Sequence, residues 1–237
     1  MRRHLIAAAL SLGMTSAALA EDINDVGSLA QSQFRLFSED IGATLSYHGQ
    51  IPAEPLGITG FDIGIAVTSA DLPRFSQYLS AFGAGAEDTL YMPTLRVHKG
   101  LPFGIDVGLM YAKVPSSNIK YTGGELKWAI IDGNTVLPAV AVRGSLTKLS
   151  GVDQLSLDTQ GFDVSVSKGL AMFTPYAGLG RVRVTSTPIG VPLAEEKFSQ
   201  TKVFAGVGLN LALVNLNFEY DKTGEVKSYS AKFGLRF

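Results

Sequence analysis

The last nine residues of the chain alternate between apolar and polar side chains, and this pattern constrains the fold most strongly. One parity holds Tyr229, Ala231, Phe233, Leu235 and Phe237, and the other holds Ser230, Lys232, Gly234 and Arg236. Period-two alternation is typical of a β-strand with one apolar and one polar face. The segment therefore predicts a strand that presents five apolar side chains on a single surface.

The same alternation recurs through the preceding chain. Apolar side chains at alternate positions occur over residues 61–67, 95–97, 103–111, 126–130, 136–142, 162–166, 182–184, 203–211 and 216–220. After residue 20, no stretch approaches the roughly 18 uninterrupted apolar residues of a membrane helix. The chain is nevertheless 46% hydrophobic, with a mean hydropathy of +0.21. Short alternating segments in such a chain predict an all-β fold, a transmembrane antiparallel up-and-down β-barrel, because successive side chains of a barrel strand face lipid and lumen in turn.

The connections between these segments alternate between short and long. The short ones are residues 99–102, 132–134, 168–169 and 213–214, and the longer, more polar ones are residues 70–90, 115–122, 148–160 and 186–199. Short periplasmic turns and long extracellular loops are typical of outer-membrane barrels. This places the end of the chain in the periplasm and lets ten strands close the barrel from Phe61 onward. Residues 221–225 are the exception, since they are short yet fall on the outer side.

The first 20 residues have the features of a secretory signal peptide. Arg2 and Arg3 give a positive start, an apolar run follows from Leu5 to Met14, and Ala18-Leu19-Ala20 forms a small-residue cleavage site. We expect cleavage before Glu21. The expected division is a signal peptide over residues 1–20, an N-terminal segment over 21–40 and the barrel over 41–237.

Residues 21–50 fit two alternatives. The stretch from Ile41 to His48 alternates well enough to be an eleventh strand, and an even strand count would then require a twelfth around Gln31 to Phe37. Alternatively, these residues form a plug or a periplasmic segment. A short helix is plausible within Asp22 to Phe37, with the apolar residues Val26, Leu29, Ala30 and Phe34. The prediction is therefore 10–12 strands with a short N-terminal helix or plug.

A second helix is expected in the first long loop. Asp71 is a suitable N-cap and Pro73 falls in the first turn. The following residues place Phe75, Tyr78, Leu79 and Phe82 on one side. This loop helix either packs on the barrel rim or folds into the lumen as a constriction.

The polar parities define the candidate lumen-facing charges. They are Asp62, Arg96, Asp106, Glu125, Lys127, Arg143, Asp163, Arg181, Arg183, Lys202, Glu219, Lys232 and Arg236. In a narrow barrel these side chains would pair into a charged ladder that fills the lumen, because a charge removed from water must be paired. In a wide, wet barrel the near balance of signs predicts a weakly selective pore.

Composition disfavours several classes of function. Removing Arg2 and Arg3 with the leader leaves 18 basic and 21 acidic residues, a balance that disfavours nucleic acid as a partner. The absence of cysteine excludes disulfides, thiolate metal sites and a cysteine nucleophile. After the leader the only histidines are His48 and His98, which we expect to be interfacial polar residues near periplasmic turns. No G-x-S-x-G or H-E-x-x-H motif occurs, so we expect no enzyme activity, no cofactor and no metal site.

The leader, the alternation and the ending Phe233-Gly234-Leu235-Arg236-Phe237 resemble the small Gram-negative outer-membrane β-barrel proteins, the broad OmpA/OmpW-like group. The resemblance implies an outer-membrane location with lipid around the barrel. It also implies that the barrel-assembly machinery recognises the last strand through Tyr229, Phe233, Leu235 and Phe237. Because the chain stops at this strand, no OmpA-like peptidoglycan-binding domain is expected after the barrel.

Three functions stay open at this point. The leading prediction is a passive channel for small molecules of unspecified identity. The first alternative is a closed structural or adhesion barrel whose loops bind partners. The second is a soluble periplasmic barrel of lipocalin type, which the apolar outward row at residues 103–111 opposes, because soluble barrels face polar residues outward.

Overall fold

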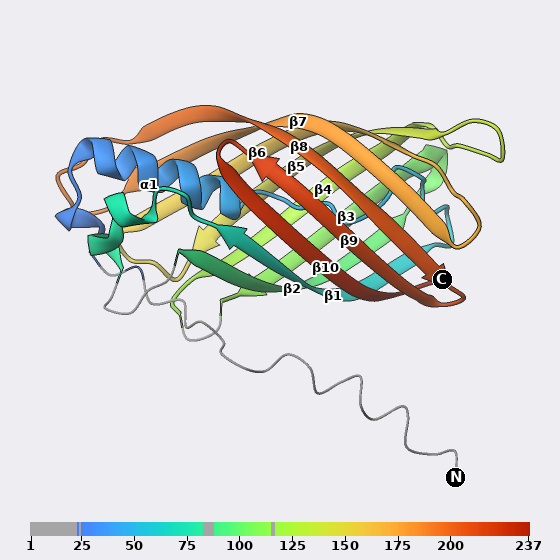
Figure 1. Ribbon diagram of the computed structural model, residues 1–237, viewed down its shortest axis with the longest axis horizontal. Helices are drawn as coiled ribbons and strands as arrows, with labels where there is room; N and C mark the ends of the chain where they lie inside the picture. The colour runs from blue at the N-terminus through green and yellow to red at the C-terminus, as the bar shows by residue number, and fades with distance from the viewer. Residues whose placement is uncertain (1–22, 24, 83–87, 115–116) are drawn as a thin grey trace, which may run out of the picture.

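Ten antiparallel strands form a single closed barrel (Figure 1). The computed structural model describes residue 23 and residues 25–82, 88–114 and 117–237. The strands are β1 Phe61–Asp71, β2 Thr89–Gly100, β3 Ile105–Lys113, β4 Lys120–Ile131, β5 Ala139–Ser150, β6 Leu155–Ser167, β7 Phe173–Pro188, β8 Glu196–Leu211, β9 Val214–Thr223 and β10 Val226–Arg236. Each strand pairs with its neighbours in sequence, and β1 pairs with β10. The predicted barrel is confirmed, with the lower of the expected strand counts.

The alternation in the sequence becomes an apolar outer surface and a mostly polar inner one. In β1, Ile63, Ile65 and Val67 point outward and are exposed, whereas Asp62 and Thr68 point inward and are buried. Large apolar side chains are exposed in the same way on all ten strands. A barrel with this outer surface fits a bilayer, so the soluble lipocalin-type alternative is disfavoured. In the described part of the chain, no helix is long and apolar enough to cross a membrane.

The two ends of the barrel differ in their connections. Residues 101–104, which include the 3₁₀ turn Pro102–Gly104, and residues 132–138, 168–172 and 212–213 join strands at the end that carries Phe237. The described residues of the first long loop, 72–82 and 88, lie at the other end, where β7 and β8 also extend as a long hairpin (Figure 1). We call this second end extracellular, because long loops face outward in outer-membrane barrels. Residues 224–225 form a tight turn there, so the exceptional short connection is confirmed.

The barrel closes where the last residue meets the first strand. The Phe61 N–H donates to the Phe237 carbonyl at 2.6 Å, and the Phe237 N–H donates back at 3.0 Å. The two rings stack with centroids 5.8 Å apart. Tyr229, Phe233 and Leu235 point outward with Phe237. Their role as an assembly signal stays a prediction.

The N-terminal segment is helical and lies inside the extracellular end of the barrel, opposite the C-terminus (Figure 1). A 3₁₀ turn, Val26–Ser28, precedes helix α1, Gln31–Thr44. Of the two alternatives for residues 21–50, the strand from Ile41 to His48 is wrong, because Phe34, Phe37 and Ile41 follow helical spacing and together bury one face of α1. The expected domain boundary after residue 40 thus falls inside a helix. The proposed signal peptide, residues 1–20, lies outside the described residues.

The first long loop packs across α1 at the mouth of the barrel. It forms two 3₁₀ turns, Phe75–Gln77 and Leu79–Ala81, in place of the single helix that was expected. The Tyr78 ring meets the Phe37 ring edge-on at 5.5 Å. Residues 72–82, the part of this loop that the structure describes before β2, therefore cap the mouth and do not form a constriction within the lumen.

Candidate functional site: the lumen and its plug

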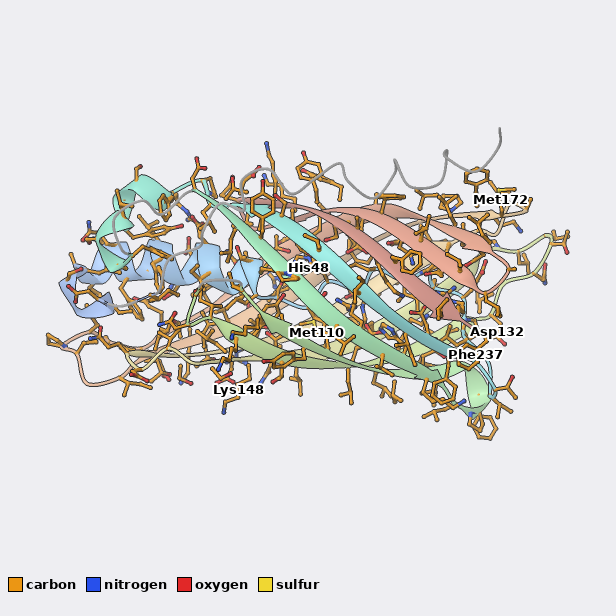
Figure 2. The ribbon with its side chains drawn as sticks, turned by 90° about the horizontal axis from the view of Figure 1, so that it is seen from below. His48, Met110, Asp132, Lys148, Met172 and Phe237 are labelled. Carbon is orange, nitrogen blue, oxygen red and sulfur yellow. The ribbon has the colours of Figure 1, made fainter. Side chains whose placement is uncertain are left out.

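The lumen is occupied by the chain's own N-terminal segment. We call residues 31–56 the plug: helix α1 followed by the stretch 45–56, which has no regular secondary structure. Every residue from 41 to 53 is buried, and Figure 2 shows His48 inside the barrel. The chain then leaves the lumen and turns at Gly57, which has a φ of +79°, before it enters β1. The plug thus runs through the lumen from the extracellular end toward the periplasmic end.

The extracellular half of the plug is held mainly by apolar packing. Phe34, Phe37 and Ile41 are fully buried in the main core cluster, which includes the inward side chains Val182 and Val184 of β7. A Cβ added to Gly42 would lie 2.6 Å from a Val184 methyl carbon, so α1 and β7 are in close contact. This half of the lumen is packed like the interior of a soluble domain.

A polar clamp fixes the loop over α1. The Arg74 side chain donates to both Glu39 and Asp40, with Nε 2.9 Å from Asp40 Oδ1, and the Arg74 N–H donates to Asp40 Oδ2 at 3.1 Å. The Tyr78 hydroxyl donates to the same carboxylate at 2.8 Å. Burial raises the pKa of the Tyr78 phenol, and the charge of Asp40 raises it further. Asp40 is fully buried, and these donors replace its hydration.

The β7–β8 hairpin holds α1 from the other side. Gln31 accepts from the Ala194 N–H at 2.8 Å and donates to its carbonyl at 3.2 Å. Arg35 pairs with Glu196 at 3.0 Å. Farther down α1, the Ser38 hydroxyl donates to the Ser186 hydroxyl at 2.8 Å, and both side chains are buried.

The periplasmic half of the plug is held through its backbone. Lys202 donates to the Tyr47 carbonyl at 2.6 Å, and Lys127 donates to the Pro52 and Glu54 carbonyls at 2.8 and 2.9 Å. Wall carboxylates accept in turn: Glu219 from the Gln50 N–H at 3.0 Å, and Asp106 from the Leu56 N–H at 3.1 Å. The luminal charges therefore replace the hydrogen-bond partners that this backbone would otherwise find in secondary structure or in water.

Arg96 is the luminal cation whose charge is compensated mainly by the plug. Its guanidinium donates to the His48 and Gly49 carbonyls and lies 4.9 Å from the centroid of the Tyr47 ring. Among the described residues, no carboxylate forms an ion pair with it, although its side chain is nearly fully buried. The compensation for this buried charge thus comes from the plug.

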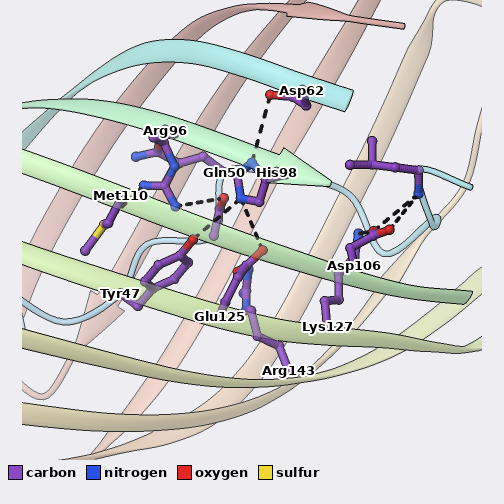
Figure 3. Close-up of polar contacts among 12 residues, drawn as sticks. Tyr47, Gln50, Asp62, Arg96, His98, Asp106, Met110, Glu125, Lys127 and Arg143 are labelled. Carbon is purple, nitrogen blue, oxygen red and sulfur yellow. Dashed lines mark hydrogen bonds and ion pairs between the residues drawn. The ribbon is translucent and has the colours of Figure 1, made fainter. Parts of the chain in front are cut away.

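Most other wall charges pair with one another (Figure 3). Arg143 bridges Asp163 at 2.9 Å and Glu125 at 3.3 Å, and Glu125 also lies 3.2 Å from His98. The remaining pairs are Lys127–Asp106 at 3.0 Å, Lys202–Asp221 at 3.2 Å, Arg236–Asp62 at 2.9 Å and Lys232–Asp62. These contacts link neighbouring strands across the inner wall.

Eleven of the thirteen predicted lumen charges point inward, and two do not. Arg181 and Arg183 are exposed on the outer surface of β7, so their assignment to the lumen is wrong. At this level the barrel holds the apolar face of α1. The inward positions are therefore the valines at 182 and 184, and the arginines take the outward parity.

Several luminal residues were missed. His48 and His98 are buried in the lumen and are not interfacial; His48 Nδ1 lies 3.6 Å from Asp221 Oδ1. The signal for His98 was its parity, which it shares with Arg96. Asp221, which the sequence places at the start of the short connection over residues 221–225, is also buried in the lumen. Tyr176, whose hydroxyl donates to Glu219 at 3.0 Å, gave no polar signal of its own. Among the described residues, no group of three His, Asp or Glu side chains is placed to hold a metal ion.

Comparison with solved structures finds other outer-membrane barrels at low sequence identity. The KdgM porin shares 7% identity with a TM-score of 0.41, and the match covers 74% of this chain and 99% of that one. Omp33 of Acinetobacter baumannii shares 8% identity with a TM-score of 0.34, covering 76% and 100%. OprG of Pseudomonas aeruginosa shares 13% identity with a TM-score of 0.33, covering 79% and 99%. No protein-family model and no curated protein matches the sequence. These similarities assign neither a family nor a ligand to this chain.

Proposed function

We propose that this outer-membrane β-barrel is closed at rest, sealed by its own N-terminal segment, and that it meets other molecules through its extracellular cap. The observation that carries this proposal is the path of residues 45–56, which run buried through the lumen between paired wall charges. An open pore of the same strand number would need water along this path.

The cap is the surface that this function would use. It consists of α1, the loop turns over residues 72–82 and the β7–β8 hairpin. The clamp of Arg74 on Asp40 and the pairing of Arg35 with Glu196 join these three elements. A preorganised surface of this kind loses little conformational entropy when it binds a partner.

Single-channel recording tests the seal. Full-length refolded protein in a planar bilayer should give no conductance steps, and a variant that lacks residues 31–56 should give steps. A disulfide-locked variant, Ser38→Cys with Ser186→Cys, should stay silent, because the two hydroxyl oxygens it replaces lie 2.8 Å apart. The chain has no other cysteine, and each single-cysteine variant is a matched control. Steady steps from the oxidised, locked protein would contradict the proposal.

The second candidate is a gated passive channel for small molecules. It is favoured by the polar attachment of the plug's periplasmic half and by the wall pairs, which include Arg143–Asp163 and Lys127–Asp106 and do not need the plug. After plug release, Arg96 would be left without its carbonyl partners and would give the pore a weak anion preference. Brief steps from the reduced double-cysteine protein, abolished by oxidation, would favour this gated channel over a permanently closed barrel.

Export and assembly complete the proposal. We expect mature protein to begin at Glu21, which intact-mass measurement of the membrane-extracted protein would check. We also expect the barrel-assembly machinery to recognise the last strand through its outward aromatic row. Removal of Phe237 should then lower the amount of heat-modifiable barrel in the membrane, whereas Phe103→Ala, at an even more exposed aromatic residue in a turn, should not.

A further inference from the structure

The two misassigned arginines belong to a basic surface on the outside of the barrel. Outward positions in the extracellular halves of β3–β7 carry the exposed cations Lys113, Lys120, Lys148, Arg181 and Arg183. Asp158 is the single acidic residue at the described outward positions of this region. Figure 2 shows Lys148 projecting away from the barrel. This face is therefore strongly positive on a chain whose net charge is −1.

These five cations differ from Lys197 and Lys222, two other cations of the outer wall that have carboxylate partners. Lys197 pairs with Glu195 at 2.5 Å, and Lys222 pairs with Glu225 at 3.6 Å. In the part of the chain that the structure describes, none of the five has an ion-pair partner. A charge on the lipid-facing side of a barrel is unfavourable unless it reaches a polar interface. The described part of the protein thus provides no ion-pair partner for the cations of the basic surface.

An apolar groove lies directly beside the basic surface. Its volume is about 780 Å³, and it is lined by Val107, Leu109, Leu126 and Leu146. Gly124 and Gly144 take outward positions in its floor, and a Cβ added to Gly144 would meet nothing within 4 Å. The groove is open because these two positions carry no side chain.

The apolar groove continues into a polar one of about 610 Å³. The two share Leu109, Gly124, Leu146 and Gln160, and the polar groove adds Thr122, Lys148, Asp158 and Thr185. Lys148 lies in register between Thr122 on β4 and Asp158 on β6, and Arg183 pairs in register with Gln160. A molecule that filled both grooves would therefore have an apolar part against leucines and an anionic part near Lys148 and Arg183.

We propose that the outer face of β3–β7 binds a phosphorylated glycolipid of the outer leaflet. One acyl chain occupies the glycine-floored groove, and Lys148 and Arg183 bind headgroup phosphate, with Lys120 and Arg181 alongside. Arginine offers paired donors to phosphate oxygens, and lysine offers a compact charge. The site lies outside the barrel and is independent of whether the lumen conducts.

Native mass spectrometry of the full-length protein in detergent tests the site, with diphosphorylated lipid A as the probe. The wild-type protein should bind this lipid, and Lys148→Gln with Arg183→Gln should bind it about tenfold more weakly or worse, since each cation near an anionic lipid surface contributes appreciably. The matched control is Lys197→Gln with Lys222→Gln, two outward cations that already have carboxylate partners. This control should bind like the wild type.

Two further experiments test the contributions of the headgroup and of the acyl chain to binding separately. Lipid A without phosphates should bind the wild type as weakly as the first double variant binds the intact lipid. Gly144→Leu should weaken binding while leaving heat-modifiability unchanged, because the added side chain enters open space. Excess inorganic phosphate should not displace the lipid. Equal binding by the wild type and the Lys148/Arg183 variant, or equal binding of both lipid forms, would overturn the proposal.

Discussion

The two halves of the plug fill the same lumen by different physical means. In the extracellular half, the apolar face of α1 packs against inward valines of β7 and aromatic residues of the loop. In the periplasmic half, a chain without regular secondary structure is held by hydrogen bonds from wall charges to its backbone. Apolar packing is non-directional and scales with the area buried, whereas hydrogen bonds to charges fix position and register. The comparison indicates that the first half stabilises the plug and the second half positions it.

The largest expected effect comes from removing a ring in the apolar half. Phe37→Ala should destabilise the packing of α1 inside the barrel by about 3–5 kcal/mol. Phe37 is fully buried and contacts the rings of Phe34, Tyr78 and Phe82. In a Ser38→Cys background, maleimide labelling of the buried thiol should accelerate by about a hundredfold or more. The single tryptophan, Trp128, lies on the outer wall and reports barrel integrity separately.

The control for this variant is Phe37→Leu, which retains most of the apolar volume and should accelerate labelling far less. Unchanged labelling in Phe37→Ala would mean that the polar half alone seats the plug, and the contrast between the two halves would fail.

The next effect comes from the polar half. Arg96→Met should loosen residues 45–50 by about 2–3 kcal/mol, because two carbonyls lose a charged donor. Hydrogen exchange of the amides over residues 45–56 should speed up, while exchange in α1 should change little. Arg96→Lys retains the charge and should show a smaller change. Equal acceleration in both halves would indicate that the plug opens as one unit.

A smaller effect is expected at the clamp between the loop and α1. Tyr78→Phe removes one hydrogen bond to the buried Asp40 carboxylate and keeps the ring that packs on Phe37. The expected cost is about 1–2 kcal/mol, measured as faster proteolysis within residues 72–82. Since Arg74 still binds Asp40 in this variant, loss of the whole cap would contradict the division of roles between ring packing and the clamp.

The smallest effect belongs to the outer surface. Lys222→Gln breaks an exposed ion pair with Glu225 and should change barrel stability by less than about 1 kcal/mol in urea unfolding followed through Trp128. Its value is as a baseline. If it matched the effect of Phe37→Ala on plug labelling, labelling would be reporting general loosening of the barrel and not the plug.

The parity of the strands was predictable from sequence wherever the lumen beside them is polar. Around Asp62, Lys232 and Glu125, polar side chains face inward and apolar ones face lipid, as alternation predicts. The same rule failed at Arg181 and Arg183, because the interior at that level is filled by α1. A parity rule that assumes a polar lumen cannot anticipate an apolar plug.

The residues from Ile41 to His48 also show that a local sequence pattern does not determine the structure. Their alternation fits a strand, but their helical continuation from Phe34 and Phe37 also fits α1, and local pattern alone does not separate the two. What decides between them is the closure of the barrel by β1 and β10, which leaves no free edge for another strand.

The sequence by itself determined the barrel, the place of its strands along the chain, its lipid-facing surface and most of its inward charges, because period-two alternation is a local property of each strand. Only the tertiary structure decided that residues 31–56 fill the lumen, that Arg96 depends on plug carbonyls, and that Arg181 and Arg183 join a basic outer face. These features arise from contacts between segments distant in sequence, such as Tyr47 with Lys202. No local pattern encodes which segment will occupy the space that a closed barrel encloses.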